Sequence, residues 1–173
     1  MIKPQKKFSN QDYQKNFLAF ENLKKHFNFL YPYLREEDFS IDVSVYNGEK
    51  AFLKKVEPIC YLELESKSLW KGHDFPDHFQ DVQFLAKKQK YLKLNKPVYW
   101  ILFNDDCSNA AIINLRKIVL CDLDIVKCKN GIGEDYFYRI PKNQFVWGIE
   151  NIERFIIHEG MNALNKLHKL QNE

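Results

Sequence analysis

The stretch from Pro58 to Lys67, PICYLELESK, decides how the rest of the chain is interpreted. Apolar residues at positions 60, 62 and 64 alternate with Glu63, Glu65 and Lys67, and this period of two is typical of a β-strand. One face of the predicted strand is therefore apolar, and the other carries two carboxylates and an ammonium. Because residues two apart on a strand lie about 6.5 to 7 Å apart, Glu65 and Lys67 can act on one small volume.

A second strand is predicted over residues 39–46, where apolar residues at 41, 43 and 45 alternate with Asp42 and Ser44. If the two strands pair antiparallel, Asp42 joins the volume that Glu65 and Lys67 share. Two carboxylates and one ammonium are the minimum set for metal-assisted hydrolysis of a phosphodiester, because carboxylate oxygens hold Mg²⁺ or Mn²⁺ and a lysine stabilises the nucleophile or the phosphate. The competing interpretation is a solvated sheet face that carries a weak surface ion pair.

The remaining pattern indicates helices and strands in alternation. A helix begins at Ser9 or Asn10 and ends near Tyr31, before Pro32, and a second helix is expected over residues 80–94. The other expected elements are a central strand over 98–104, strands over 110–113, 118–120 and 136–140, and a helical tail over 149–170 that Gly160 breaks in two.

This order of elements, with Asp42 on one strand and Glu65-Ser66-Lys67 on the next, resembles the PD-(D/E)XK nuclease superfamily over about residues 10–115. The resemblance implies an α/β fold with a restriction-endonuclease-like core: a mixed central β-sheet flanked by helices in the order αβββαβ, followed here by a C-terminal helical segment. It also implies that Asp42 and Glu65 bind a metal ion with the Ser66 carbonyl, and that Lys67 positions nucleophile and phosphate. Glu21 falls on the acidic residue that many members carry in the first helix, where it would support a second metal ion or an ordered water.

Glu63 is an additional acid on the same strand face, and we expect it to be an accessory residue. It leaves open whether Glu63 or Glu65 is the main metal ligand. Gln89 lies within the apolar stripe of the second predicted helix, where it is either a satisfied core amide or a group that points into the active cleft.

A row of lysines in the second predicted helix, Lys87, Lys88, Lys90 and Lys93, is expected to contact nucleic-acid phosphates. The alternative for this row is an ordinary solvated helix face. Trp70, in a loop over residues 68–78, is a candidate stacking surface for a base.

Composition sets the outer limits of the interpretation. The chain has 173 residues, 45% of them apolar and 28% charged, and a formal charge of +3, which fits one compact domain. We expect a single domain over 1–173, with a loose tail at 1–9, the core at about 10–115, and strands and a C-terminal helix over 116–173. Apolar runs are far shorter than the ~20 residues that a bilayer span needs, so a soluble cytoplasmic protein without membrane contact is expected.

The sequence therefore predicts an endonuclease that depends on Mg²⁺ or Mn²⁺ and hydrolyses DNA, acting through Asp42, Glu65, Lys67 and Glu21. The alternative is a catalytically inactive nuclease-like domain that binds nucleic acid or a protein partner. The C-terminal helical segment is expected either to cap the sheet or to form a homodimer face.

Overall fold

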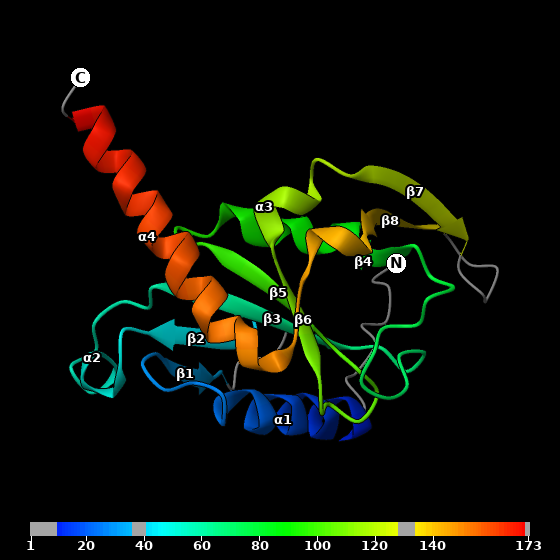
Figure 1. Ribbon diagram of the computed structural model, residues 1–173, viewed down its shortest axis with the longest axis horizontal. Helices are drawn as coiled ribbons and strands as arrows, with labels where there is room; N and C mark the ends of the chain where they lie inside the picture. Colours follow the sequence, from blue (N-terminus) through cyan, green and yellow to red (C-terminus); the bar gives the residue numbers. More distant parts are fainter. Residues whose placement is uncertain (1–9, 36–40, 128–133, 172–173) are drawn as a thin grey trace, which may run out of the picture.

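The computed structural model describes residues 10–35, 41–127 and 134–171, which form two sheets and several helices (Figure 1). The strands are β1 (Tyr31–Leu34), β2 (Val43–Tyr46), β3 (Cys60–Ser66), β4 (Asp81–Leu85), β5 (Val98–Phe103), β6 (Ala110–Asn114), β7 (Asp122–Lys127), β8 (Glu134–Pro141) and β9 (Val146–Trp147). The helices are α1 (Asn10–Lys24), α2 (Glu49–Leu53), η1 (Ala86–Lys93), α3 (Leu115–Ile118), η2 (Lys142–Gln144), η3 (Ile149–Asn151) and α4 (Ile152–Gln171), where η marks 3₁₀ turns.

The larger sheet has six strands in the order β1-β2-β3-β5-β6-β9. Its first three strands form an antiparallel meander, and β5 then pairs parallel to β3 in a register that runs from Tyr61 opposite Val98 to Ser66 opposite Phe103. All six residues of β5 are buried, because both faces of this strand are covered. The predicted central strand over 98–104 is confirmed, and so is the mixed character of the sheet.

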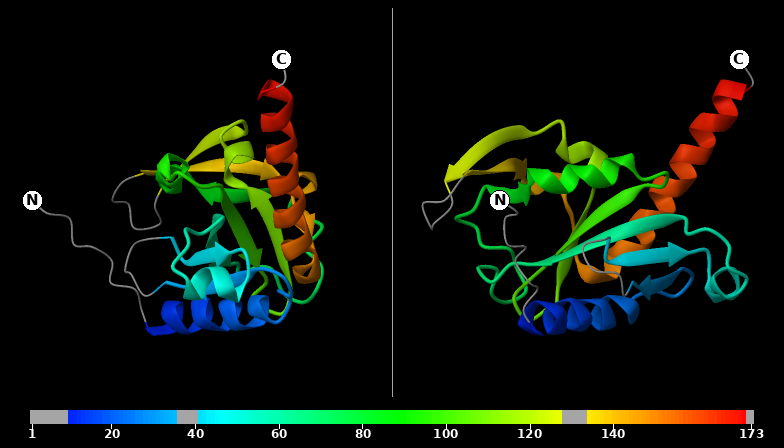
Figure 2. Two further views of the ribbon diagram at one scale, coloured as in Figure 1. Left: turned by 90° about the vertical axis from the view of Figure 1, so that its left-hand side faces the viewer. Right: turned by 180° about the vertical axis from the view of Figure 1, so that it is seen from behind.

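Three layers surround two hydrophobic cores (Figure 2). On one face of the six-stranded sheet, α1 and α4 bury Leu23 and Ile156 against Leu62 and Ile101. On the other face of the six-stranded sheet, β4 and β8 of the second sheet cover its central strands. Phe84 of β4 lies edge to face with Trp100 of β5, at 4.7 Å between ring centroids. Alternate residues of β5 thus belong to different cores.

The helix expected over residues 80–94 is wrong in its first half. Residues 81–85 form β4, in which Val82 and Phe84 are buried while Gln83 is exposed, and β4 pairs antiparallel with β8. The second sheet has the order β4-β8-β7. Apolar residues at 82, 84, 85 and 86 fit both periods, and pairing with a strand more than 50 residues away decided between them. Only residues 86–93 are helical, in the 3₁₀ form.

Other element boundaries also differ from expectation. The first helix ends at Lys24, and the next residues turn back into β1, which supplies the third strand of the antiparallel unit. Pro32 is tolerated there because β1 is an edge strand. The strand expected at 118–120 is instead the end of α3 and a turn. The strands at 110–113 and 136–140 are confirmed, and α4 passes Gly160 without a break. In the described ranges, no helix combines the length and apolar character needed to cross a membrane.

A buried carboxylate connects the two ends of the fold. Glu153 in the first turn of α4 is 5% exposed, and its Oε1 accepts hydrogen bonds from the backbone N–H groups of Asn28, Phe29 and Leu30 at 2.7 to 3.0 Å. These donors lie just before β1, so Glu153 fixes where the edge strand enters the sheet. A charged acceptor bound by three N–H groups is stronger than neutral hydrogen bonds.

Replacing Glu153 by Ala should lower the free energy of unfolding by about 2 to 4 kcal/mol, because three buried backbone donors lose their acceptor. Urea unfolding followed by circular dichroism measures this loss. Arg154→Ala, at the adjacent exposed position, should change stability by less than about 0.5 kcal/mol. Equal effects for the two variants would contradict the anchoring role of Glu153.

Candidate active site

Three carboxylates meet near the middle of the larger sheet, where β3 lies between β2 and β5. Glu63 and Glu65 stand opposite Trp100 and Leu102 in the parallel register, so they share the face of the second core. Asp42 immediately precedes β2, whose antiparallel register with β3 pairs Val43 with Leu62. That register brings Asp42 beside Glu63.

Two lysines neutralise the carboxylates. The Lys88 ammonium, from η1, lies 2.9 Å from Glu63 Oε1 and 3.1 Å from Glu65 Oε2, so it bridges the two glutamates. The Lys67 ammonium lies 2.5 Å from Glu65 Oε1 and also donates to the Gln83 carbonyl at 3.3 Å. We call these five residues, Asp42, Glu63, Glu65, Lys67 and Lys88, the carboxylate–lysine cluster.

The Asp42 carboxylate accepts hydrogen bonds on two sides. Its Oδ2 accepts a hydrogen bond from the Leu64 N–H at 2.7 Å, and its Oδ1 accepts a longer one from the Asn16 amide of α1 at 3.5 Å. Burial, followed by repulsion from Glu63, raises the pKa of Asp42 from 3.8 to about 7. Near neutral pH this carboxyl therefore holds its proton more tightly than an exposed aspartate does.

The other charged groups respond to the same burial in different directions. Burial raises the pKa of Glu63, although Lys88 opposes this shift. Burial also raises the pKa of Glu65, but the Lys88 and Lys67 ammonium groups outweigh it, and the pKa of Glu65 ends below its usual value. Burial disfavours the charged form of Lys88, yet Glu65 and Glu63 hold its pKa above the usual value. Glu65 and Lys88 are therefore ionised.

The carboxylate oxygens of the cluster are the type of donor that a hard divalent cation prefers, although they are not arranged around a common cation position in this structure. Glu63 is 6% exposed, and its Oε2 is buried without a hydrogen-bond partner among the residues that the structure describes. An unsatisfied buried carboxylate oxygen beside a second carboxylate is costly unless a proton or a cation joins them. No three His, Cys, Asp or Glu side chains in the described ranges stand in metal-holding geometry, and the Lys88 ammonium lies between Glu63 and Glu65.

The structure brings some of the predicted site residues together and separates others. Glu65, Lys67 and Asp42 lie in the cluster, and Glu63, expected to be accessory, lies at its centre. Glu21 makes no ion pair or hydrogen bond with the cluster in the part of α1 that is described, and Asn16 is the α1 residue that contacts Asp42. A role for the Ser66 carbonyl stays a prediction.

The predictions for Trp70, a nucleic-acid contact, and for Gln89, an accessory residue, need correction. Trp70 is 1% exposed in the second core, where its ring packs edge to face against Phe75 and Trp147, so it offers no face to a base. Gln89 is exposed and accepts a hydrogen bond from the Tyr138 hydroxyl at 2.9 Å, so it is neither a core amide nor a member of the cluster. The side chains of Lys87, Lys90 and Lys93 are exposed, and their phosphate contacts stay a prediction.

Sequence reasoning missed the position of Lys88 among the lysines of its row. A 3₁₀ helix repeats every three residues, so Lys88 and Tyr91 share one face of η1. Burial, with the Glu63 and Asp42 charges next, raises the pKa of Tyr91, which places this side chain beside the cluster as well. The spacing of three would have paired these residues, but only if the 3₁₀ form had been known.

Comparisons with known proteins show a likeness in fold. The structure matches that of D212, a nuclease from a fusselovirus, with a TM-score of 0.52 and 14% sequence identity, covering 92% of this chain and 99% of D212. No protein-family model matches the sequence, and no curated protein matches it. The chain therefore has the fold of a viral nuclease, at an identity too low to assign its activity.

Replacing Asp42 by Asn should raise the free energy of unfolding at pH 8, measured with EDTA present. The folded state binds the Asp42 proton more tightly than the unfolded state, so wild-type stability falls as pH rises from about 4 to 7, by an amount of order 1 to 3 kcal/mol. The variant has no such proton and should lose most of this slope.

Urea unfolding at pH 5 and pH 8 measures the slope. Asp74→Asn, whose side chain is 98% exposed, is the matched control and should keep the wild-type slope. Identical slopes for wild type and Asp42→Asn would show that Asp42 is not desolvated by its surroundings.

Proposed function

We propose that this protein is a metal-dependent nuclease of the PD-(D/E)XK kind that hydrolyses phosphodiester bonds of DNA. The observation that carries the proposal is the carboxylate–lysine cluster, in which Asp42 and Glu63 lie side by side and one Glu63 oxygen is buried without a hydrogen-bond partner among the described residues. The fold shared with D212 supports the same function.

Asp42, Glu63 and Glu65 are the residues that would hold Mg²⁺ or Mn²⁺, with the Ser66 carbonyl as a further oxygen ligand. Such ions prefer carboxylate and carbonyl oxygens. When bound, the cation lowers the pKa of a water molecule and offsets negative charge on the phosphate. Because the cation has to replace the Asp42 proton, binding should weaken as the pH falls below about 7.

The lysines have separate tasks in this proposal. Lys67 is fixed by Glu65 and by the Gln83 carbonyl, and it lies 5.7 Å from the centre of the Trp100 ring. An ammonium held on several sides stabilises a phosphate without reorganisation at the moment of reaction. Lys88 balances the charge of Glu63 and Glu65, and its ammonium would be free to turn toward the phosphate if these carboxylates held a cation.

Glu21 has no part in this scheme, because α1 presents Asn16 to Asp42. The inactive binding domain remains the alternative function. The observation that favours it is the Lys88 ammonium, which already bridges two of the carboxylates that a cation would need.

The wild-type protein should cleave DNA with Mg²⁺ or Mn²⁺ and not with EDTA. Asp42→Asn, Glu63→Gln, Glu65→Gln and Lys67→Ala should each reduce the cleavage rate by about 100-fold or more. The first three each remove a carboxylate that would hold the cation, and the fourth removes positive charge that would stabilise the phosphate. Rates on linear, nicked, single-stranded and four-way DNA measure this. Lys50→Ala, on the exposed surface of α2, is the control and should keep wild-type activity.

A wild-type protein that binds DNA but cleaves none of these substrates would contradict the nuclease proposal and favour the inactive binding domain. Circular dichroism establishes that each variant is folded before its rate is compared.

Lys88→Met should bind Mn²⁺ more tightly than wild type at pH 8, by about tenfold, because no ammonium has to be displaced from Glu63 and Glu65; tenfold corresponds to about 1.4 kcal/mol. Titration calorimetry measures the affinity. Lys93→Met, an exposed position on the same helix, is the control. An unchanged or weaker Mn²⁺ affinity for Lys88→Met would contradict the exchange.

A further inference from the structure

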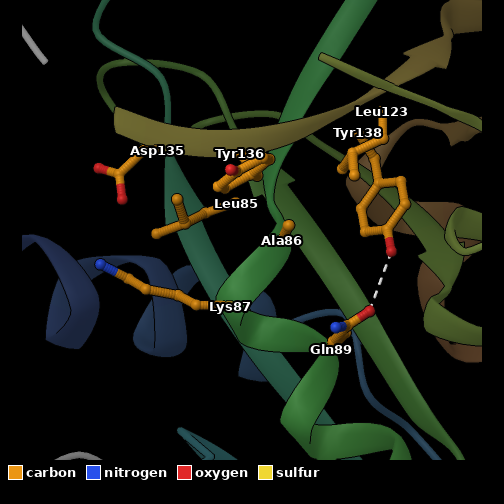
Figure 3. Close-up of a pocket in the computed structure, with 8 residues that line it drawn as sticks. All are labelled: Leu85, Ala86, Lys87, Gln89, Leu123, Asp135, Tyr136 and Tyr138. Carbon is orange, nitrogen blue, oxygen red and sulfur yellow. Dashed lines mark hydrogen bonds between the residues drawn. The ribbon is translucent and has the colours of Figure 1, made fainter. Parts of the chain in front are cut away.

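A pocket of about 280 Å³ lies between η1 and the β7–β8 hairpin (Figure 3). Apolar and aromatic side chains form much of its wall, and a lysine, a glutamine and an aspartate stand at its rim. The lining residues are Leu85, Ala86, Lys87, Gln89, Leu123, Asp135, Tyr136 and Tyr138.

The helix η1 connects this pocket to the carboxylate–lysine cluster. In a 3₁₀ helix, residues three apart share a face, so Ala86 and Gln89 turn one face to the pocket while Lys88 turns another to Glu63. Lys87 and Gln89 are the chain neighbours of Lys88, and consecutive Cα atoms lie about 3.8 Å apart. The pocket and the carboxylate–lysine cluster therefore lie against different faces of the same short helix.

The chemistry of the pocket suits a flat, polar-edged ring. Tyr136 is 46% exposed and offers an aromatic ring for stacking. The Tyr138 hydroxyl donates to Gln89 Oε1 at 2.9 Å, which fixes the glutamine amide and leaves its Nε2 facing no acceptor among the described residues (Figure 3). The Lys87 side chain is exposed at the rim, where it can reach an anion.

We propose that this pocket binds one unpaired nucleobase of the DNA strand, stacked on Tyr136, with the Gln89 amide at its edge and Lys87 against the adjoining phosphate. The proposal rests on the proposed nuclease function and adds to it a substrate class, DNA with an unpaired base beside the cleaved bond. A duplex keeps its bases stacked inside the helix and cannot fill the pocket, whereas a single strand presents base and phosphate together.

The test measures binding without cleavage, in EDTA. A fluorescein-labelled single-stranded oligonucleotide and a blunt-ended duplex of two complementary strands that contains the same sequence are titrated with the full-length protein, and anisotropy gives each affinity. Tyr136→Ala should weaken binding of the single strand by about 5- to 100-fold, which is the usual effect of losing one base–aromatic stack, and should leave duplex binding within about twofold.

Two further variants keep the outcome interpretable. Tyr136→Leu retains an apolar side chain if the alanine variant is unstable, and it should lose single-strand affinity while Tyr136→Phe retains it. Tyr13→Ala removes an exposed tyrosine from α1 and is the matched control, with no expected change. Melting temperatures establish that the variants are folded.

The inference and the nuclease proposal can fail separately. Normal single-strand affinity in Tyr136→Ala and Tyr136→Leu, or an equal loss for single strand and duplex, would overturn the base pocket even if the wild type cleaves DNA. Loss confined to the single strand would support the pocket even if the wild type cleaves nothing. If the wild type binds the single strand no more strongly than the duplex, the base pocket is also overturned. A side chain of a protein partner would then be the occupant to test.

Discussion

The parallel pairing of β3 with β5 is the constraint on which the site depends. Because β5 is buried on both faces, every second residue of β3 is carried toward the second core, where Trp100 and Leu102 stand opposite Glu63 and Glu65. A sheet usually places apolar side chains at such positions, and this one places carboxylates there. Their charge is supported from outside the strand, by the Lys88 ammonium of η1 and by Lys67 just beyond the strand end.

The carboxylate–lysine cluster lowers the stability of the folded state. Placing the buried Glu63 beside the half-buried Asp42 costs stability at neutral pH, in line with the raised pKa of Asp42, and a well-packed apolar pair would be more stable. Perturbed pKa values concentrate at functional sites, which supports the proposed function. Lys88 moderates the strain by bridging Glu63 and Glu65, which ties the integrity of the site to the position of η1.

The sequence pattern predicts best those elements whose secondary structure depends least on distant parts of the chain. The alternation in β3 and the continuous apolar run of β5 predict these strands correctly, because each strand displays its burial in its own residues. The pattern over residues 81–85 does not distinguish the strand β4 from a helix, since these residues fit either period and their pairing partner β8 lies far along the chain. For the same reason the sequence does not predict that the Lys88 side chain faces Glu63 and Glu65, since its direction depends on the 3₁₀ form of η1.

The composition of the site was predictable in kind and less so in arrangement. A strand face with Glu63, Glu65 and Lys67 announces a charged cluster, but the order of contacts depends on the register with β2, which puts Glu63 beside Asp42. Trp70 shows why exposure is hard to predict from sequence. An aromatic residue in a loop is expected to be exposed for base stacking, but Trp70 is enclosed by residues as distant in sequence as Trp147.

We propose that a divalent cation takes the place of the Lys88 ammonium among Asp42, Glu63 and Glu65. Anomalous diffraction from crystals of the protein soaked in Mn²⁺ tests it most directly. We expect a single strong anomalous peak within coordination distance of Asp42 and Glu63, with the Lys88 ammonium moved away from Glu63. A fully soaked crystal with no peak there and with Lys88 still bridging Glu63 and Glu65 would contradict it.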